Sequence, residues 1–417
     1  MAISSAQITS SELVISALQF LSILFIFVLG LIVLGVIITY ILDISQTADA
    51  IRRNYPVIGR FRSLFSKLGE FFRHYFFAMD REEMPFNRAE RDWVNRAAKD
   101  FDNTTAFGST KNLGSPDTVI FVNCPFPTLD EEAVEMQPLE IGPYCKYPYH
   151  APSFFNISAM SLGSISVPAV KALSRGAHLA GCWLNTGEGG LSSYHLEGGC
   201  DIVMQIGTAK YGVRNKNGEL DDNKLREVAA HEQVRMFELK MSQGAKPGKG
   251  GILPGMKITP EIASIRGIPV GKDSISPNRH LEIDSASEML DMIEHIRHVT
   301  GKPTGFKAVI GGIGWLETMC EDIHLRGIKS APDFMTIDSG DGGTGAAPMS
   351  LVDNVGLLIQ ESLPMVLDTL RRYNLNNRIK VIASGKLITP SEVAFAIATG
   401  ADFVMSARGF MFSLGCI

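Results

Sequence analysis

The sequence predicts an α/β protein, a barrel of eight parallel strands and surrounding helices known as the (β/α)8 or TIM barrel, preceded by a membrane-spanning helix. Beyond residue 150, short apolar runs alternate with helical segments, which implies a parallel sheet covered by helices. Eight such runs over about 260 residues match a closed barrel. A doubly wound open sheet would need fewer strands, and no Gly-x-Gly-x-x-Gly motif follows the first run.

The elements follow one another in regular order. The expected strands are residues 154–160, 182–186, 201–207, 235–241, 304–310, 333–339, 380–384 and 402–406. The expected helices between them include 167–181, 285–299, 315–327 and 391–400.

Residues 13–42 contain no charged side chain, whereas about 20 apolar residues are enough to cross a bilayer. A signal peptide is the alternative, but it would have a basic start and a shorter apolar core, and Glu12 is the only charge before this stretch. Basic residues follow the helix and none precedes it, which predicts a single-pass protein with its C-terminal bulk in the cytoplasm. These residues are Arg52, Arg53, Arg60, Arg62, Lys67 and Arg73.

The remaining chain divides into three parts. Residues 43–79 form a basic and aromatic connector, and 61–77 fit either a helix on the membrane surface or an ordinary amphipathic connector. Residues 80–150 are polar and weakly periodic, which indicates an irregular extension packed on the barrel domain, 151–417. Only eleven residues follow Ser406 at the end of the eighth strand, so we expect the domain to be incomplete and the C-terminus truncated.

Charge and cysteine content narrow the function class. A net charge of -5, with no basic block, argues against nucleic acid as the main partner. The six cysteines contain no Cys-x-x-Cys pair and are typical of reduced thiols in an intracellular domain.

Two glycine-containing turns follow the last strands, 383–386 ("ASGK") and 406–409 ("SARG"). The loops after strands seven and eight of such barrels often hold phosphate. Gly385 allows backbone N–H groups to approach an anion, and Arg408 adds a fork-shaped donor. Each turn alone could be an ordinary surface turn, but their joint position favours a phosphate site.

The loop 338–348 ("DSGDGGTGAAP") follows strand six on the same face. Its four glycines would let the main chain lie against a flat, phosphate-bearing cofactor. Asp338 and Asp341 either orient neighbouring groups or cap the turn.

Further loops converge on that face. Glu188 lies on the glycine loop 185–190, and the loop 240–255 carries three lysines among five glycines, which suits an anionic substrate such as a dicarboxylate or a solvated flexible loop. Lys307 lies inside strand five, where an inward-facing lysine needs a negative partner, and we expect a cofactor to supply it. The three lysines are Lys240, Lys246 and Lys249.

Four motifs in this order resemble the FMN-binding domain of glutamate synthases, and more closely the stand-alone FMN-binding glutamate synthase family, whose members often have an N-terminal membrane segment. The resemblance runs from about residue 80 to the last residue. The motifs are "ISAMSLGSIS" (157–166), "NTGEGG" (185–190), "QGAKPGKGGILPG" (243–255) and "SGDGGTGAAP" (339–348).

The resemblance implies a barrel that holds FMN at its strand ends and reduces 2-iminoglutarate, formed from 2-oxoglutarate and ammonia, to glutamate. It implies three groups of flavin contacts, for the ring, its pyrimidine edge and the phosphate end, and a substrate site around Glu188, Lys246 and Arg266. The flavin contacts are Ala159, Met160 and Ser161; Gln205 and Lys307; and Gly340, Gly342, Gly343, Gly385, Ser406 and Arg408.

Three departures from the family pattern bear on the function. Ile252 replaces the glutamine of the family's "GGQLPG", which weakens the assignment of the keto acid substrate. A membrane helix stands where glutamate synthases have a glutaminase domain, so ammonia would come from solution or a partner. Cys416 matches only the first of three family iron–sulfur ligands, so we expect a cluster only if the native chain continues past Ile417.

Three hypotheses follow. The first is an FMN-dependent oxidoreductase of glutamate synthase type on the cytoplasmic side of a membrane, with a ferredoxin-like electron donor by analogy. The second keeps the fold and the flavin but changes the substrate to another amino or hydroxy acid. The third is a non-catalytic, truncated, membrane-tethered module.

Overall fold

The computed structural model divides the chain into two compact units, Met1–Pro85 and Phe86–Ile417, which we describe separately. The residues that it describes are 10–77, 81–115, 118–244, 250–342 and 347–416.

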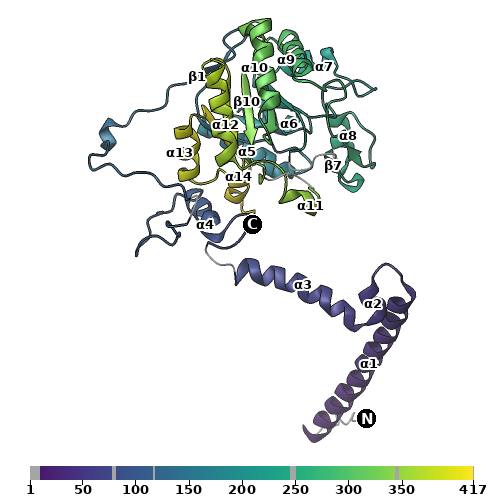
Figure 1. Cartoon of the computed structure of the whole chain (residues 1–417). Coiled ribbons are helices and arrows are strands. Elements are labelled where there is room, and N and C mark those ends of the chain that lie inside the picture. The colour runs from purple at the N-terminus through teal and green to yellow at the C-terminus, as the bar shows by residue number, and fades with distance from the viewer. Residues whose placement is uncertain (1–9, 78–80, 116–117, 245–249, 343–346, 417) are drawn as a thin grey trace, which may run out of the picture. The chain divides into compact units, whose positions relative to one another are not determined.

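The first unit consists of three helices joined by short turns (Figure 1). They are α1 (Ser10–Ser45), α2 (Ala50–Asn54) and α3 (Ile58–Tyr75). The most apolar 18-residue stretch of α1 has a mean hydropathy of 3.2, and none of this stretch is buried. By length and composition, α1 is therefore apolar enough to cross a membrane, a test that a signal sequence would also pass.

The second unit is a closed barrel of eight strands, and every pair of neighbouring strands is parallel. The order around the barrel is β3 (Phe155–Ile157), β4 (Leu184–Asn185), β5 (Ile202–Ile206), β6 (Val234–Lys240), β9 (Thr304–Val309), β10 (Phe334–Asp338), β11 (Lys380–Ser384) and β12 (Phe403–Ser406). Each strand lies within a run that the sequence predicted, or extends one residue beyond it, so the predicted fold class is confirmed.

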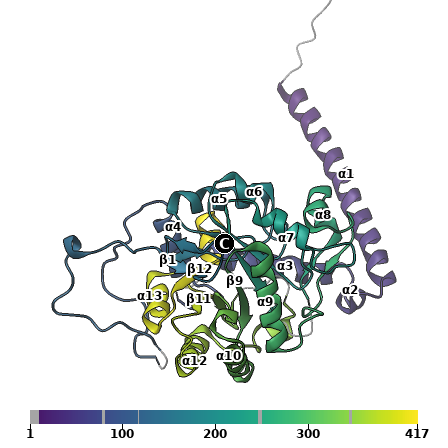
Figure 2. The ribbon, with the colours of Figure 1, turned by 90° about the horizontal axis from the view of Figure 1, so that it is seen from above.

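Helices surround the strands, as Figure 2 shows for α5, α9, α10 and α12. The longer ones are α5 (Val167–Ala180), α7 (Asp222–Ala229), α9 (Ala286–Thr300), α10 (Gly314–Arg326), α12 (Ile359–Arg372) and α13 (Pro390–Thr399). The sequence sets their ends locally: the Ser166 hydroxyl accepts a hydrogen bond from the Ala169 N–H at the start of α5, and Gly181 at φ 65° ends it. The short helices are α6 (Ser193–Glu197), α8 (Pro260–Arg266), α11 (Met349–Val352) and α14 (Arg408–Ser413), and α14 follows the last barrel strand.

Residues 86–151 are less irregular than the sequence predicted. They contain α4 (Arg88–Ala97) and a hairpin of β1 (Leu139–Ile141) and β2 (Tyr149–Ala151). Ile141 and Tyr149 of the hairpin pack with barrel residues such as Trp183 in one buried cluster. Three-residue strands are too short to give a readable pattern, which explains the difference.

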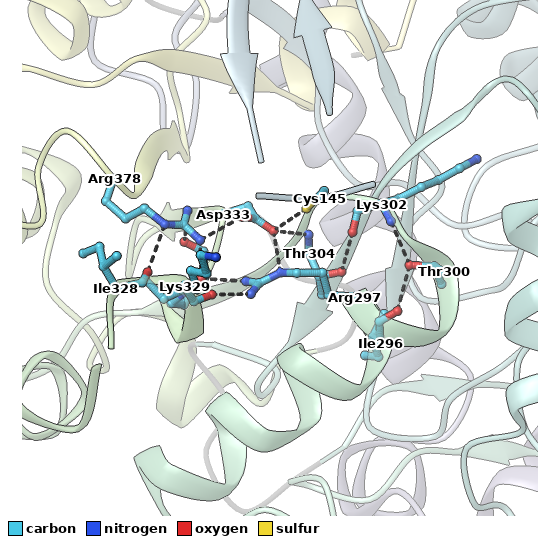
Figure 3. Close-up of polar contacts among 12 residues, drawn as sticks. Cys145, Ile296, Arg297, Thr300, Lys302, Thr304, Ile328, Lys329, Asp333 and Arg378 are labelled. Atoms are coloured by element: carbon cyan, nitrogen blue, oxygen red, sulfur yellow. Dashed lines mark hydrogen bonds and ion pairs between the residues drawn. The ribbon is translucent and has the colours of Figure 1, made fainter. Parts of the chain in front are cut away.

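The amino-terminal end of the barrel holds a buried ionic network around Asp333, directly before β10 (Figure 3). Its carboxylate accepts hydrogen bonds from Arg297 Nε at 2.9 Å, Arg378 Nη2 at 3.0 Å and the Thr304 N–H at 2.9 Å. The Cys145 thiol donates to the same carboxylate at 3.3 Å, and burial first, then the Asp333 charge, raises the pKa of Cys145 far above its usual value. The network ties α9 and the segment before β11 to the start of β10, and we assign this end of the barrel to stability.

Candidate active site

A cavity of about 450 Å³ lies at the carboxyl ends of the strands, where barrel enzymes carry their active sites. Residues in or directly after all eight strands line it. Representatives in strand order are Ser158, Glu188, Gln205, Lys240, Lys307, Ser339, Gly385 and Ser406.

Most of the residues that the sequence predicted for this site line the cavity. They are Ala159, Met160, Ser161, Glu188, Gln205, Lys307, Gly342, Gly385, Ser406, Arg408 and Cys416. Lys246 and Gly343 lie outside the described residues. Gly340 and Arg266 are not among the lining residues, and the structure gives each a specific environment.

Lys307 lies on the cavity wall with only 8% of its surface exposed. Its Nζ is 2.8 Å from Asp338 Oδ2, so a protein carboxylate supplies its negative partner, and not a cofactor as the sequence predicted. Burial on its own lowers the pKa of Lys307, but the charges of Asp338 and Glu238 raise it, and the net shift is upward. Lys307 is therefore a fixed positive charge facing the cavity.

Glu238 of β6 is fully buried inside the barrel and was not predicted as a site residue. Its carboxylate accepts hydrogen bonds from Gln205 Nε2 at 2.6 Å, Asn185 Nδ2 at 2.8 Å and Thr336 Oγ1 at 2.6 Å. Because the amide nitrogen of Gln205 is bound to Glu238, the orientation of its carboxamide in the cavity is fixed. A glutamate inside the apolar run of a strand was the sequence signal for this role.

Glu188 is held by two side chains from the end of β6. Gln243 Nε2 donates to Glu188 Oε2 at 2.6 Å, and Lys240 Nζ lies 3.6 Å from the same oxygen. Two glycines leave room for this carboxylate: a Cβ at Gly207 would lie 2.7 Å from it, and a Cβ at Gly251 2.9 Å. Gln243 was not predicted as a site residue, although it begins one of the quoted motifs.

The turns after β11 and β12 form another part of the cavity. Gly385 has φ 106°, and a Cβ there would lie 2.4 Å from the Cβ of Ser339. The Ser406 hydroxyl is buried and has no hydrogen-bond partner, which leaves it available for a ligand. Lys386 Nζ is 2.8 Å from Asp341 Oδ2, so Asp341 orients a basic neighbour rather than only capping its turn.

Gly340 is required by packing within the protein. Its N–H donates to the Leu357 carbonyl at 2.8 Å, and a Cβ at Gly340 would lie 2.4 Å from the Gly356 carbonyl oxygen. The close approach that this glycine allows is therefore to another backbone segment.

Arg266 is buried beside the cavity, with 5% of its surface exposed. Its guanidinium donates to the Leu162 carbonyl at 3.3 Å and to Ser274 Oγ at 3.4 Å, and it lies over the Tyr211 ring. Its Nε has no partner, and burial lowers the pKa of Arg266. Arg266 supports the wall formed by the glycine loop, since its Nη2 lies 3.3 Å from where a Gly189 Cβ would be.

Ile252 and Cys416, which were singled out for the substrate and for an iron–sulfur cluster, also line the cavity. Ile252 of β7 (Ile252–Leu253), which pairs with β8 (Ser274–Ile275), gives the cavity wall an apolar side chain. Among the described residues, no group of three or more His, Cys, Asp or Glu side chains is placed to hold a metal ion.

Comparisons with known proteins connect this site to a family. Residues 130–417 match the family model described as the conserved region in glutamate synthase. The glutamate synthase large subunit-like protein YerD of Bacillus subtilis is 41% identical over an alignment of 417 positions. The alignment covers 91% of this chain and 79% of that protein. The archaeal-type glutamate synthase [NADPH] of Thermotoga maritima is 34% identical over 290 residues, 69% of this chain and 52% of that protein.

The archaeal glutamate synthase [NADPH] of Methanocaldococcus jannaschii is 34% identical over 262 residues, 62% of this chain and 48% of that protein. The chain thus spans about half the length of these two synthases. A solved flavocytochrome b2 structure has a TM-score of 0.42 and 15% identity, covering 63% of this chain and 59% of that one, a similarity too distant to inform the function. The family match covers more than half of the chain, and so the chain belongs to the glutamate synthase family.

Proposed function

We propose that this protein is an FMN-dependent oxidoreductase of glutamate synthase type, acting on CH–NH2 donors, which reduces 2-iminoglutarate, formed from 2-oxoglutarate and ammonia, to glutamate. The observation that carries the proposal is the fixed positive charge of Lys307 in a cavity lined by all eight strand ends. A cation there would stabilise the anionic reduced form of a flavin ring. Family membership supports the same reaction class.

The residues present fit a phosphorylated flavin. The buried, unpartnered Ser406 hydroxyl and the turn at Gly385, where no side chain fits, suit a phosphate, and Arg408 adds a positive charge. Bound FMN would supply the hydride. Residues 159–161 would line its ring, and Gln205 and Lys307 would meet its pyrimidine edge. Gly342 and Gly343 would approach its ribityl chain, with Gly340 supporting that loop through Gly356.

The substrate end would lie beside Glu188. Gln243 and Lys240 hold the Glu188 carboxylate in one position, so it can orient an amine or imine group by hydrogen bonding. Lys246 and Arg266 are proposed as the partners of the two substrate carboxylates. Arg266 would bind its carboxylate from a buried position beside the cavity.

We also propose a membrane location and an electron donor for the protein. The apolar helix α1 supports a single-pass protein, and the basic residues after α1 favour a cytoplasmic location for the barrel. A ferredoxin-like protein is the proposed electron donor. An iron–sulfur cluster would require ligands beyond Cys416, and nucleic acid is not a proposed partner.

The test uses the full chain purified in detergent. We expect a visible flavin absorbance, its bleaching on anaerobic reduction, and its return on addition of 2-oxoglutarate together with ammonia. Neither compound alone should restore it, because the imine needs both. A colourless protein that does not bind added FMN would overturn the proposal.

The apolar wall at Ile252 favours a second candidate substrate, another amino or hydroxy acid. We expect Ile252→Gln to raise the rate of flavin reoxidation by 2-oxoglutarate plus ammonia about tenfold, since one hydrogen bond contributes about 0.5–1.5 kcal/mol. Ile275→Gln is the matched control, because Ile275 pairs with Ile252 across the hairpin and is 65% exposed. If Ile252→Gln slows reoxidation, the second candidate is favoured.

A further inference from the structure

Helix α3 (Ile58–Tyr75) has a continuous apolar stripe that no described residue of the first unit covers. Its members follow helical spacing of three and four residues, so they share one face. They are Ile58, Phe61, Phe65, Leu68, Phe72 and Tyr75, all exposed, with 64% of the Phe65 surface accessible. Phe76 and Phe77 extend the exposed aromatic surface beyond the helix end.

The basic charge of α3 indicates which kind of surface the apolar stripe would contact. The helix contains Arg60, Arg62, Lys67 and Arg73, with Glu70 as its single acidic residue. An aromatic stripe flanked by basic residues is typical of a helix lying in the plane of an anionic membrane surface. A second protein copy would place two such basic helices against each other, which their charge opposes.

The corner between α1 and α3 is held by an ion pair between the buried carboxylate of Asp43 and the exposed side chain of Arg60, with α2 at the bend (Figure 1). The Asp43 side chain, 1% exposed, accepts hydrogen bonds from Arg60 Nε at 2.9 Å and Nη2 at 2.7 Å. It also accepts from the Val57 N–H at 3.0 Å, at the start of α3. Gln46 Nε2 donates to the carbonyls of Asp43 and Asp49, which ties the end of α1 to the start of α2.

This ion pair connects α3 to α1, the helix that we propose crosses the membrane. Because Asp43 lies near the end of the apolar span and Arg60 in the first turn of α3, the two ends are held together where the chain would leave the bilayer. A rigid corner there limits the directions that α3 can take and keeps its stripe close to the lipid headgroups.

We propose that α3 lies in the lipid–water interface of an anionic leaflet, with its aromatic stripe toward the acyl chains and the Asp43–Arg60 pair fixing its direction. This inference rests on the proposed membrane location of α1. The occupant of the stripe is the bilayer, and the basic residues make its contact depend on anionic lipid.

The experiment uses the full chain in nanodiscs of phosphatidylcholine, with or without phosphatidylglycerol, and quenching of tryptophan fluorescence by brominated acyl chains. Phe65→Trp reports on the stripe, and the signal of Trp93, Trp183 and Trp315 is measured in the parent protein and subtracted. We expect the added fluorescence to be quenched by lipids brominated near the headgroup, and more strongly with phosphatidylglycerol. Equal, weak quenching in both nanodiscs would overturn the proposal.

Phe27→Trp, in the middle of α1, separates this inference from the proposed membrane location. Strong quenching of that reporter by lipids brominated deep in the chain, with none for Phe65→Trp, would overturn the interface helix alone. No quenching at either position would overturn the membrane location itself.

Two variants of equal charge test the corner. Adding Arg60→Gln to the Phe65→Trp protein removes the partner of Asp43, so we expect lower fluorescence anisotropy and a loss of headgroup-depth quenching. Adding Arg62→Gln instead removes a charge from the same helix without touching Asp43, and we expect the anisotropy to stay unchanged. Equal effects of the two variants would overturn the role of the ion pair.

Discussion

Lys307 and Glu238 carry opposite charges inside the barrel, where water has little access to either. Buried charges persist when they are paired and hydrogen-bonded, and removal of one partner leaves the other uncompensated. Asp338 and Glu238 surround Lys307, while Glu238 accepts three hydrogen bonds of its own. The two residues therefore serve the stability of the barrel as well as the proposed cofactor site.

Replacing Lys307 should affect both properties. We expect Lys307→Met to lower the free energy of unfolding by about 3 kcal/mol, because Asp338 is left without its cation, and to abolish FMN binding. Denaturant unfolding and FMN titration measure the two effects. Arg371→Met is the control, since its pair with Asp368 is exposed to solvent and should be worth about 1 kcal/mol or less. Equal losses in the two variants would contradict this assignment.

Replacing Glu238 tests the hydrogen-bond network around its carboxylate and removes one of the two negative charges beside Lys307. Glu238→Gln keeps the shape but turns one acceptor oxygen into an N–H2 donor that faces other donors, so we expect a loss of about 1–3 kcal/mol in the free energy of unfolding. FMN binding should weaken because Gln205 loses its fixed orientation. Glu140→Gln, an exposed position in β1, should leave both measurements unchanged. Unaltered stability of Glu238→Gln would show that the network is not required.

At the scale of the elements, the turn after β11 can be compared with another glycine position to distinguish the effect of backbone strain from that of steric contact. Gly385 and Gly327 have φ of 106° and 99°, which disfavour other residues similarly. A Cβ at Gly385 would lie 2.4 Å from Ser339, whereas a Cβ at Gly327 would meet nothing within 4 Å. The two positions are a matched pair for substitution.

We expect Gly327→Ala to lower the free energy of unfolding by about 1–3 kcal/mol through backbone strain alone. Gly385→Ala should cost more, because the loop carrying Ser339 must move, and it should also weaken FMN binding. Thermal unfolding and FMN titration measure these effects. If Gly385→Ala binds FMN as the parent does, this turn does not hold the cofactor.

The eight strands could be predicted because each is an apolar run buried on both faces and bounded by turn residues. The β1–β2 hairpin could not be predicted, because strands of three residues give no period. The hairpin takes its place from tertiary contacts, in which Ile141 and Tyr149 fill the end of the barrel beside Trp183.

At the scale of the whole molecule, motifs predicted where the site lies but not how its side chains pair. Asn185, Glu238 and Thr336 come from three strands far apart in the sequence, and only the closure of the barrel brings them together. In the same way, the sequence assigned Gly340 to the cofactor, whereas the structure places it against Gly356. Such contacts depend on tertiary structure, which a local pattern does not contain.

Two buried histidines link the stability of the barrel to pH. Burial lowers the pKa of His195 and of His280 to about 4, below the usual 6.5. His280 Nε2 donates to the Lys240 carbonyl at 2.9 Å, while its Nδ1 has no partner, so a second proton would lie on an unpaired nitrogen. The Lys210 charge also lowers the pKa of His280, whereas the hydrogen bond to the Lys240 carbonyl and the charges of Glu282 and Glu188 raise it.

Because the folded state binds these protons only near pH 4 and the unfolded state near pH 6.5, the stability is complete above pH 6.5 and is lost as the pH falls toward 4. Each histidine contributes roughly 3 kcal/mol to that loss. Between pH 6.5 and pH 4, we expect the free energy of unfolding of His280→Gln to fall by roughly 3 kcal/mol less than that of the parent. Denaturant unfolding at each pH measures this difference. His231→Gln, at an exposed position, should follow the parent. Parallel curves for His280→Gln and the parent would show that His280 is not the group that titrates.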